Sequence, residues 1–406
     1  MISEKKTVTI VSLKLLNIQK GTERSLSLVN KIKAGFSSYI CHTDWLLVLA
    51  CTAASGYGLA LVYSAVKTAG AGYRDFIIQL AACIVGLIVA MLISKIDYDI
   101  ICKLWPVLSG ISLILVLLTF TPLGLEVADD KAWLSIPIIG TFQPSELLKI
   151  TFIISFAAHL SKVHERLNEI SVLIPVCIHG LIPAGLIFLQ GDDGTAIVFL
   201  CIFVTMLFIA GLKPLYLILA FTGVAGAVPV VWQMMSDDKR NRFLSLIFVE
   251  QYAKNTGWQQ QHALVSIGSG RLWGVGYIQG GDNYLYARNN DFIFTVAGEE
   301  FGFIGGLLLL ALIVLVVLAL LRQILKARDL QGMLLCGGIM AMIGFQSLIN
   351  LGMNLRLLPV IGITLPFFSK GGSSIATLFL GIGVALSVYY SSNVRSRDSI
   401  FSNRLN

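Results

Sequence analysis

The sequence predicts an all-α, polytopic membrane protein of ten transmembrane helices, and three observations support this fold class. Of the 406 residues, 56% are hydrophobic and only 13% are charged, whereas about a quarter of a soluble domain is charged. The mean hydropathy is +0.81. Apolar runs long enough to cross a bilayer recur along the chain. They span residues 45–66, 75–93, 104–122, 144–161, 170–189, 195–212, 214–233, 292–321, 332–352 and 372–391.

The remaining segments define the expected organisation of the chain. Residues 1–43 are a basic tail, which we expect to lie on anionic headgroups, and no signal peptide is predicted. Residues 44–392 form the membrane domain and residues 393–406 a second tail. The run 292–321 exceeds about 20 residues, so it should tilt or project beyond the bilayer. The seven cysteines are scattered without a C-x-x-C pair, so neither a disulfide framework nor a zinc site is indicated.

The distribution of basic residues predicts the orientation. An even number of spans places both termini on one side of the membrane. With the N-terminus inside, 18 of the 30 Lys and Arg residues fall on the inner side, so both termini are expected to be cytoplasmic. A large extracellular loop, about 234–291, then lies between helices 7 and 8. The outer face also receives loops 123–143 and 353–371, and loops on a rigid scaffold often carry function.

The outer loop before the fourth span carries the first polar constellation. Pro144 suits the first turn of a helix, which Gln143 or Ser145 would cap. Glu146 and Lys149 are three residues apart on one helical face. They either neutralise each other inside the bundle or provide a phosphate ligand with a carboxylate beside it. Earlier in the loop, Trp133 is either an interfacial anchor or a platform for stacking a sugar.

A short acidic turn follows the fifth span. Asp192 and Asp193 join two apolar runs with almost no spacer. One interpretation is a polar turn with a helix cap at Asp193 or Thr195. The alternative is a cation site at Asp192, because carboxylate oxygens suit hard divalent ions.

Two further stretches point to the outer face. The large loop contains Arg242, Gln259 and a glycine-rich run at 268–276, which together suggest a functional lid or a glycine-rich surface segment. Residues 353–371 are apolar but broken by Gly and Pro, so this backbone must be buried in protein or line a wet cavity. We interpret them as a re-entrant segment that lines the site and leads to Ser373 and Ser374 at the start of the last helix.

Asp291 stands where the large loop meets the next apolar run. A carboxylate at a membrane boundary is costly to bury, so it is a functional candidate. The structural alternative is a cap on the following helix.

Six motifs occur in the order known from one family, and the chain resembles the SEDS proteins (shape, elongation, division and sporulation) from about residue 44 to residue 392. The motifs are Phe142-Gln143-Pro144-Ser145-Glu146 with Lys149, Gln190-x-Asp192-x-Gly194-Thr195, Arg240-x-Arg242-Phe243, Gln259 with Ile267-Gly268-Ser269-Gly270, Asp291-Phe292-Ile293-Phe294 with Gly298-Glu299-Glu300-x-Gly302, and Asn350-x-Gly352-Met353 leading to Gly371-Gly372-Ser373-Ser374.

This resemblance implies a peptidoglycan glycosyltransferase that polymerises lipid II into β-1,4 glycan at the outer face of the bacterial cytoplasmic membrane. Asp291 would be the general base. Lys149, Arg242 and a divalent cation, Mg²⁺ or Mn²⁺ with Asp192 as a ligand, would stabilise the leaving pyrophosphate. The other expected substrate-binding residues are Trp133, Gln143, Ser145, Glu146, Gln259, Ser373 and Ser374. Implied partners are undecaprenyl-pyrophosphate-linked glycan and a class B penicillin-binding protein, and no nucleic acid.

The sequence departs from the family pattern near the acid. Asn289 and Asn290 stand where the family often has His-Thr, Arg356 replaces a frequent glycine, and Lys370 replaces a tyrosine. Arg356 and Lys370 should add positive charge to the outer cavity, which would strengthen pyrophosphate binding or mark an altered substrate.

Two other functions compete with the polymerase. A transporter of lipid II or a similar amphiphile would need ionisable groups near the middle of the membrane. The acids of this chain instead gather at the outer boundary, which favours the enzyme. An inactive scaffold for a transpeptidase partner is the third hypothesis.

Overall fold

The computed structural model describes residue 39 and residues 41–70, 72–127, 130–136, 140–252, 257–281, 285 and 288–402. The chain forms two compact units. One combines both chain ends, Met1–Asp44 and Asn393–Asn406, and within it the Thr43 hydroxyl donates a hydrogen bond to the Tyr39 carbonyl at 2.7 Å. The other, Trp45–Ser392, contains the helical bundle and every residue of the candidate site.

The described residues are mostly helical, and the helices coincide with the predicted apolar runs. In the part of the chain that the structure describes, eight helices are long and apolar enough to cross a membrane, and two shorter apolar helices fall at the third and sixth predicted spans. The count of ten membrane crossings stays a prediction. The bounds are α2 Trp45–Thr68, α3 Arg74–Ile93, α4 Tyr98–Lys103, α5 Trp105–Leu118, α6 Pro144–Val163, η1 His164–Arg166, α7 Ile170–Leu189, α8 Asp193–Ile209, α9 Pro214–Met234, α10 Asp237–Ile247, α11 Val249–Tyr252, α12 Trp258–Ser269, α13 Ile293–Lys326, α14 Leu330–Asn354 and α15 Gly372–Ser402.

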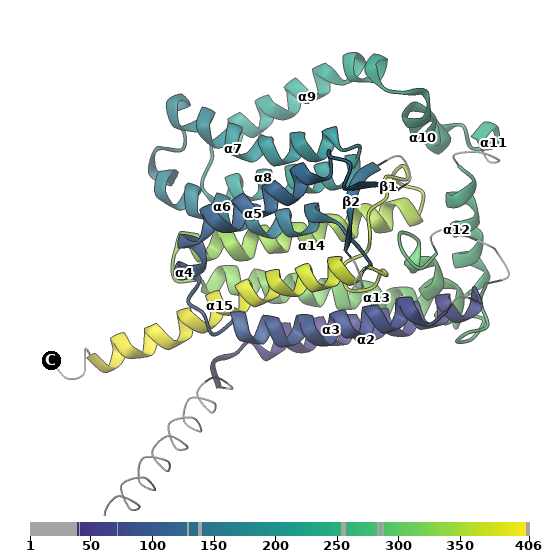
Figure 1. Cartoon of the computed structure of the whole chain (residues 1–406), viewed down its shortest axis with the longest axis horizontal. Helices are drawn as coiled ribbons and strands as arrows, with labels where there is room; N and C mark the ends of the chain where they lie inside the picture. The colour runs from purple at the N-terminus through teal and green to yellow at the C-terminus, as the bar shows by residue number, and fades with distance from the viewer. Residues whose placement is uncertain are drawn as a thin grey trace, which may run out of the picture. The chain divides into compact units, whose positions relative to one another are not determined.

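The loop before α6 adds a small sheet to the predicted all-α fold. Three strands, β1 Gly124–Val127, β2 Asp130–Ile136 and β3 Gly140–Phe142, form an antiparallel sheet in the order β1-β2-β3. Figure 1 shows β1 and β2 toward the end of the bundle that also carries α10, α11 and α12. Within the predicted outer loop 234–291, the described residues form three helices, α10, α11 and α12.

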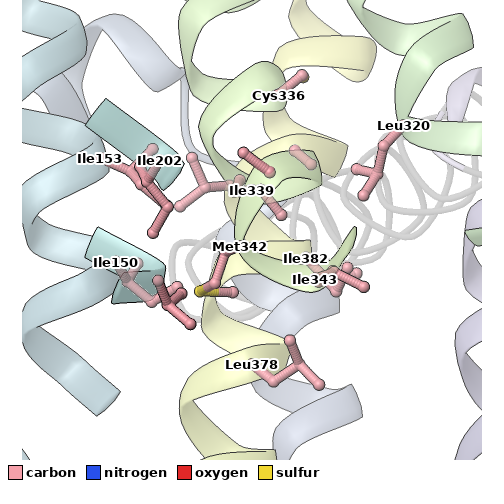
Figure 2. Close-up of a cluster of buried hydrophobic side chains, with 14 of the residues drawn as sticks. Ile150, Ile153, Ile202, Leu320, Cys336, Ile339, Met342, Ile343, Leu378 and Ile382 are labelled. Atoms are coloured by element: carbon pink, nitrogen blue, oxygen red, sulfur yellow. The ribbon is translucent and has the colours of Figure 1, made fainter. Parts of the chain in front are cut away.

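The middle of the bundle is filled with aliphatic side chains. Figure 2 shows α14 at its centre, with Ile339, Met342 and Ile343 between side chains from the neighbouring helices. Each of the labelled side chains is buried. The partners labelled around α14 are Ile150 and Ile153 from α6, Ile202 from α8, Leu320 from α13, and Leu378 and Ile382 from α15. Small residues allow this close packing, since a Cβ on Gly381 would stand 2.9 Å from Ile150 Cδ1.

The long run that begins at 292 is broken rather than simply tilted. Gly302 has φ 66° and ψ −160°, so α13 consists of a short outer helix and a longer spanning helix that meet at this residue. Only glycine adopts this conformation at low cost. The sequence missed the break because hydropathy is continuous across it.

The predicted re-entrant segment remains non-helical. Helix α14 ends at Asn354 and α15 begins at Gly372. Between them Ile363, Leu365 and Phe368 are at most 3% exposed. The second half of this segment is therefore buried in protein, as the Gly and Pro content predicts, whereas Leu357 in its first half is 73% exposed.

Candidate active site

Two segments hold the backbone at Asn290 and Asp291. The Asp291 carbonyl accepts hydrogen bonds from the side-chain amides of Asn350 at 2.8 Å and Asn354 at 2.9 Å, both on α14. The Ser369 hydroxyl donates to the Asn290 carbonyl at 2.6 Å. The acid, at the end of the large loop, is therefore fixed by the C-terminal end of α14 and by the re-entrant segment.

The Asp291 side chain does not cap α13. The helix begins at Ile293 with Phe292 at the N-cap position, and no side chain accepts a capping hydrogen bond there. The capping interpretation is therefore wrong. Among the described residues, no donor contacts the Asp291 carboxylate.

The surroundings of Asp291 suit a base. Burial, with a smaller effect from the negative charge of Asp192, raises the pKa of Asp291 to about 6. A carboxylate with this pKa is ionised at neutral pH and accepts a proton more readily than an exposed one.

A second polar cluster lies at the N-terminal end of α6. The Lys149 ammonium donates to Glu146 Oε1 at 2.9 Å and to Gln346 Oε1 at 3.1 Å, and Lys149 is only 1% exposed. The Ser374 hydroxyl contacts Glu146 Oε2 at 3.3 Å. The predicted Glu146–Lys149 pair is therefore confirmed. An ammonium has three donors, so Lys149 retains one that no described residue accepts.

Asp192 connects these two clusters. Its Oδ1 accepts the Thr195 N–H at 2.9 Å, which makes Asp192 the cap of α8 instead of Asp193 or Thr195. Its Oδ2 accepts the Gln143 side-chain amide at 2.9 Å. Burial raises the pKa of Asp192, and the nearby charges of Lys149 and Glu146 act on it in opposite directions.

The proposed caps of α6 are not observed. Gln143 occupies the N-cap position without a side-chain capping bond, because its amide contacts Asp192 instead. Ser145 is 1% exposed, and its hydroxyl has no partner among the described residues. Pro144 begins the helix as predicted.

A charged rim surrounds the site. Lys239 on α10 pairs with Asp193 at 2.5 Å, and the Arg242 guanidinium reaches the Val360 carbonyl at 3.5 Å. Burial raises the pKa of Asp130 to about 6, with a further contribution from Asp192, while the nearby Arg242 opposes it. Asp130 and Lys239 were not singled out from the sequence. Only the fold places β2 and α10 beside the acidic turn.

The structure places three other predicted residues, Gln259, Ser373 and Trp133, with different hydrogen-bond contacts and burial. Gln259 makes no hydrogen bond to the described cluster, whereas its neighbour Gln260 donates to the carbonyls of Met353 at 2.9 Å and Leu358 at 2.7 Å. Ser373 uses its carbonyl to accept the Thr377 hydroxyl. Trp133 lies in β2, opposite Leu125, and is half-buried.

The unusual basic residues have structural partners. Lys370 Nζ pairs with Asp75 Oδ2 at 2.6 Å. Arg356, with φ 58°, donates to the Ser245 carbonyl at 2.6 Å and to Gln261 Oε1 at 3.0 Å. Lys370 is thus paired with a carboxylate, whereas the Arg356 guanidinium binds two neutral acceptors, so the expectation that Arg356 adds positive charge stays a prediction.

The described residues do not offer a preformed metal cage. No group of three or more His, Cys, Asp or Glu side chains among them is arranged to hold a metal ion. Both oxygens of Asp192 already accept hydrogen bonds. The dependence on Mg²⁺ or Mn²⁺ therefore stays a prediction, and the chemistry below is derived from the chain's own residues.

Comparisons with known proteins agree on one family. A family model described as "Cell cycle protein", for FtsW, RodA and SpoVE, matches residues 44–394. A probable peptidoglycan glycosyltransferase FtsW of Trichlorobacter lovleyi is 31% identical over 360 residues, 86% of this chain and 93% of the relative. Stage V sporulation protein E of Bacillus subtilis is 31% identical over 369 residues, 85% of this chain and 96% of the relative. A chain from the structure of a peptidoglycan synthase complex that coordinates polymerization and crosslinking aligns with TM-score 0.74 and 28% identity, covering 86% of this chain and 98% of that one.

Proposed function

This chain belongs to the FtsW, RodA and SpoVE family and is a peptidoglycan glycosyltransferase of a bacterial membrane, and on this premise we propose that Asp291 is its general base. The observation that carries the proposal is a half-buried carboxylate with a pKa raised to about 6. The backbone carbonyl of Asp291 accepts hydrogen bonds from Asn350 and Asn354, and no described residue donates to its carboxylate oxygens.

The proposed reaction transfers a glycan chain between two lipid-linked substrates. Asp291 removes the proton of the acceptor's 4-hydroxyl as that oxygen attacks the donor's anomeric carbon. The new C–O bond forms while the bond to the pyrophosphate oxygen breaks, and the electron pair leaves with undecaprenyl pyrophosphate. The substrate assignment to lipid II rests on the family, whose members act on this class of molecule.

The leaving group needs positive charge and hydrogen-bond donors. Lys149 supplies an ammonium already positioned by Glu146 and Gln346, with one donor to spare. Arg242 lies at the rim and could approach a phosphate that Lys149 does not reach. The unpartnered Ser145 hydroxyl is the third candidate, because a buried hydroxyl without a partner is costly unless a ligand satisfies it.

The wider assignments are also proposals. We assign the site to the outer face with both termini cytoplasmic, on the distribution of Lys and Arg. Similarity to a chain of a synthase complex that joins polymerization to crosslinking supports a class B penicillin-binding protein as partner. The aliphatic middle of the bundle argues against a polar transport path through α6, α14 and α15 (Figure 2).

The test is polymerisation of lipid II by the purified protein. Wild type should produce glycan polymer and Asp291→Asn should not. Asp193→Asn, which changes a nearby acid outside the proposed base position, is the matched control and should retain polymerisation. Equal polymer from Asp291→Asn would remove Asp291 as the base, and no polymer from wild type with a cognate transpeptidase would favour a scaffold.

Folding of the variant needs a separate measurement. Burial raises the pKa of Asp291, so its ionised form is less favourable in the folded protein than in the unfolded chain at neutral pH. Asp291→Asn should therefore unfold at a temperature no lower than wild type. Chelation of divalent cations in the same assay tests the predicted dependence on Mg²⁺ or Mn²⁺.

A further inference from the structure

The chain between α12 and α13 turns back onto the break in α13. We call residues 271–277 the loop tip. Its backbone pairs with both sides of the break: the Val275 N–H donates to the Glu299 carbonyl at 2.9 Å, and the Phe303 N–H donates to the Arg271 carbonyl at 2.8 Å. A break at Gly302 leaves backbone groups without helical partners, and the loop tip satisfies several of them.

These hydrogen bonds determine the depth of the loop tip. Phe303 and Ile304 are the first residues of the spanning part of α13, and they are 65% and 41% exposed within an apolar stretch. A helix surface of this kind contacts lipid in a membrane protein. The Ile304 N–H donates to the Leu272 carbonyl at 3.3 Å, so the tip is level with the start of that surface.

A contact with α2 gives an independent measure of depth. The Tyr277 hydroxyl donates to the Ala60 carbonyl at 3.1 Å. Ala60 lies eight residues before Thr68, the last residue of α2, which is about 12 Å along the helix axis. The loop tip therefore descends beside the bundle instead of standing above it.

The side chains of the loop tip are apolar and uncovered. Trp273 is 77% exposed, Leu272 is 52% and Val275 is 44%, and Arg271 beside them is also exposed. Trp is enriched where membrane meets water, and Arg there can reach lipid phosphates. The backbone is held firmly, because Arg271 and Ile278 adopt φ values of 49° and 63°, which persist only where contacts enforce them.

We propose that the loop tip is a membrane anchor, with Leu272, Trp273 and Val275 inserted among lipid acyl chains at the interface on the side of the active site. The argument for lipid as the occupant is the continuity of this patch with the exposed face of α13 at Phe303 and Ile304. A membrane-inserted tip also restrains the site, since its bonds to α13 lie beside Glu299, which holds Arg288 at 2.5 Å.

The test uses the full-length protein in proteoliposomes whose lipids carry bromine at a shallow acyl position. Bromine quenches tryptophan fluorescence on contact. The contribution of Trp273 is the difference between wild type and Trp273→Phe, and it should be quenched several-fold more than that of Trp258. The matched control is Trp258→Phe, because Trp258 lies in the same loop but packs on His262, with ring centroids 4.1 Å apart.

Two outcomes would overturn the proposal. No quenching of Trp273 above that of a sample without brominated lipid would place the loop tip in water. Trp273 fluorescence could instead be unaffected by brominated lipid and change only when a transpeptidase partner is added. That result would show that the patch is a protein interface. Phe at an exposed position keeps the loop apolar, so folding is not expected to obscure the result.

Discussion

The polar half of the bundle, at the end that carries Asp291, differs in character from the aliphatic half of the same helices. In the polar half, α6 and α14 bury Lys149, Glu146 and Asn350, and the Ser374 hydroxyl at the start of α15 lies 3.3 Å from Glu146 Oε2. Deeper in the bundle, the same three helices meet through aliphatic side chains (Figure 2). Polar groups are buried only where hydrogen bonds and charges compensate each other. The polar residues of the candidate site therefore gather at one end of the bundle, and the aliphatic middle packs the helices together.

The largest expected effect is that of removing the buried charge of Lys149 in the polar half. Lys149→Met leaves the Glu146 carboxylate buried without its cation, which costs about 3–5 kcal/mol of stability in comparable buried pairs. Polymerisation should also be lost. Thermal unfolding in detergent measures the first effect, and the lipid II assay measures the second.

The control for this variant removes both charges. Lys149→Met combined with Glu146→Gln should recover most of the lost stability but not the activity. Equal destabilisation by the single and double variants would show that the pair does not neutralise itself as the 2.9 Å contact indicates.

A truncation in the aliphatic half should affect stability alone. Ile343 is fully buried, and Ile→Ala changes in protein cores cost about 2–5 kcal/mol. The cost here should lie near the lower limit, because lipid is as apolar as the protein interior and only packing is lost. Ile343→Ala should lower the unfolding temperature while turnover per folded molecule stays unchanged. A loss of turnover without a loss of stability would contradict the division between the two halves.

The pH dependence of activity should follow the ionisation of Asp291 in the polar half. Asp291 acts as a base only when ionised, and burial raises its pKa to about 6. Polymerisation should therefore be constant at higher pH and fall about tenfold per unit below that pKa. The stability effect has the opposite sign, because the cost of ionised Asp291 in the folded state decreases as pH falls below about 6 and is gone below the unfolded pKa of 3.8. A rate that stays constant down to pH 4 would exclude this carboxylate as the base.

The smallest expected effects are those of replacing Ser374 and Ser145 with alanine. Ser374→Ala removes one contact with Glu146, so it should cost about 0.5–1.5 kcal/mol of stability. Ser145 has no described partner, so Ser145→Ala should leave the unfolding temperature unchanged and raise KM if the hydroxyl binds substrate. A stability loss at Ser145 with unchanged KM would assign it a structural role.

Much of the site could be predicted from the sequence because its residues carry local signals. Pro144 at a helix start, Glu146 and Lys149 on one helical face, and an isolated acid at 291 are all visible in short windows of sequence. The roles of Asp130, Lys239 and Gln260 were not predictable, because each depends on a partner far away in the chain: the acidic turn for the first two, and the carbonyls of Met353 and Leu358 for Gln260.

The sequence by itself determined the membrane class, the positions of the apolar helices and the family, since hydropathy and motif order are properties of contiguous residues. Only the tertiary structure decided that Asp192 rather than Asp193 caps α8, that Asp291 caps nothing, and that α13 breaks at Gly302. It also decided that Arg356 and Lys370 are bound by protein groups. The physical reason is that a polar side chain or a strained backbone binds the partner that folding brings within hydrogen-bond distance. Hydropathy along the sequence does not identify that partner.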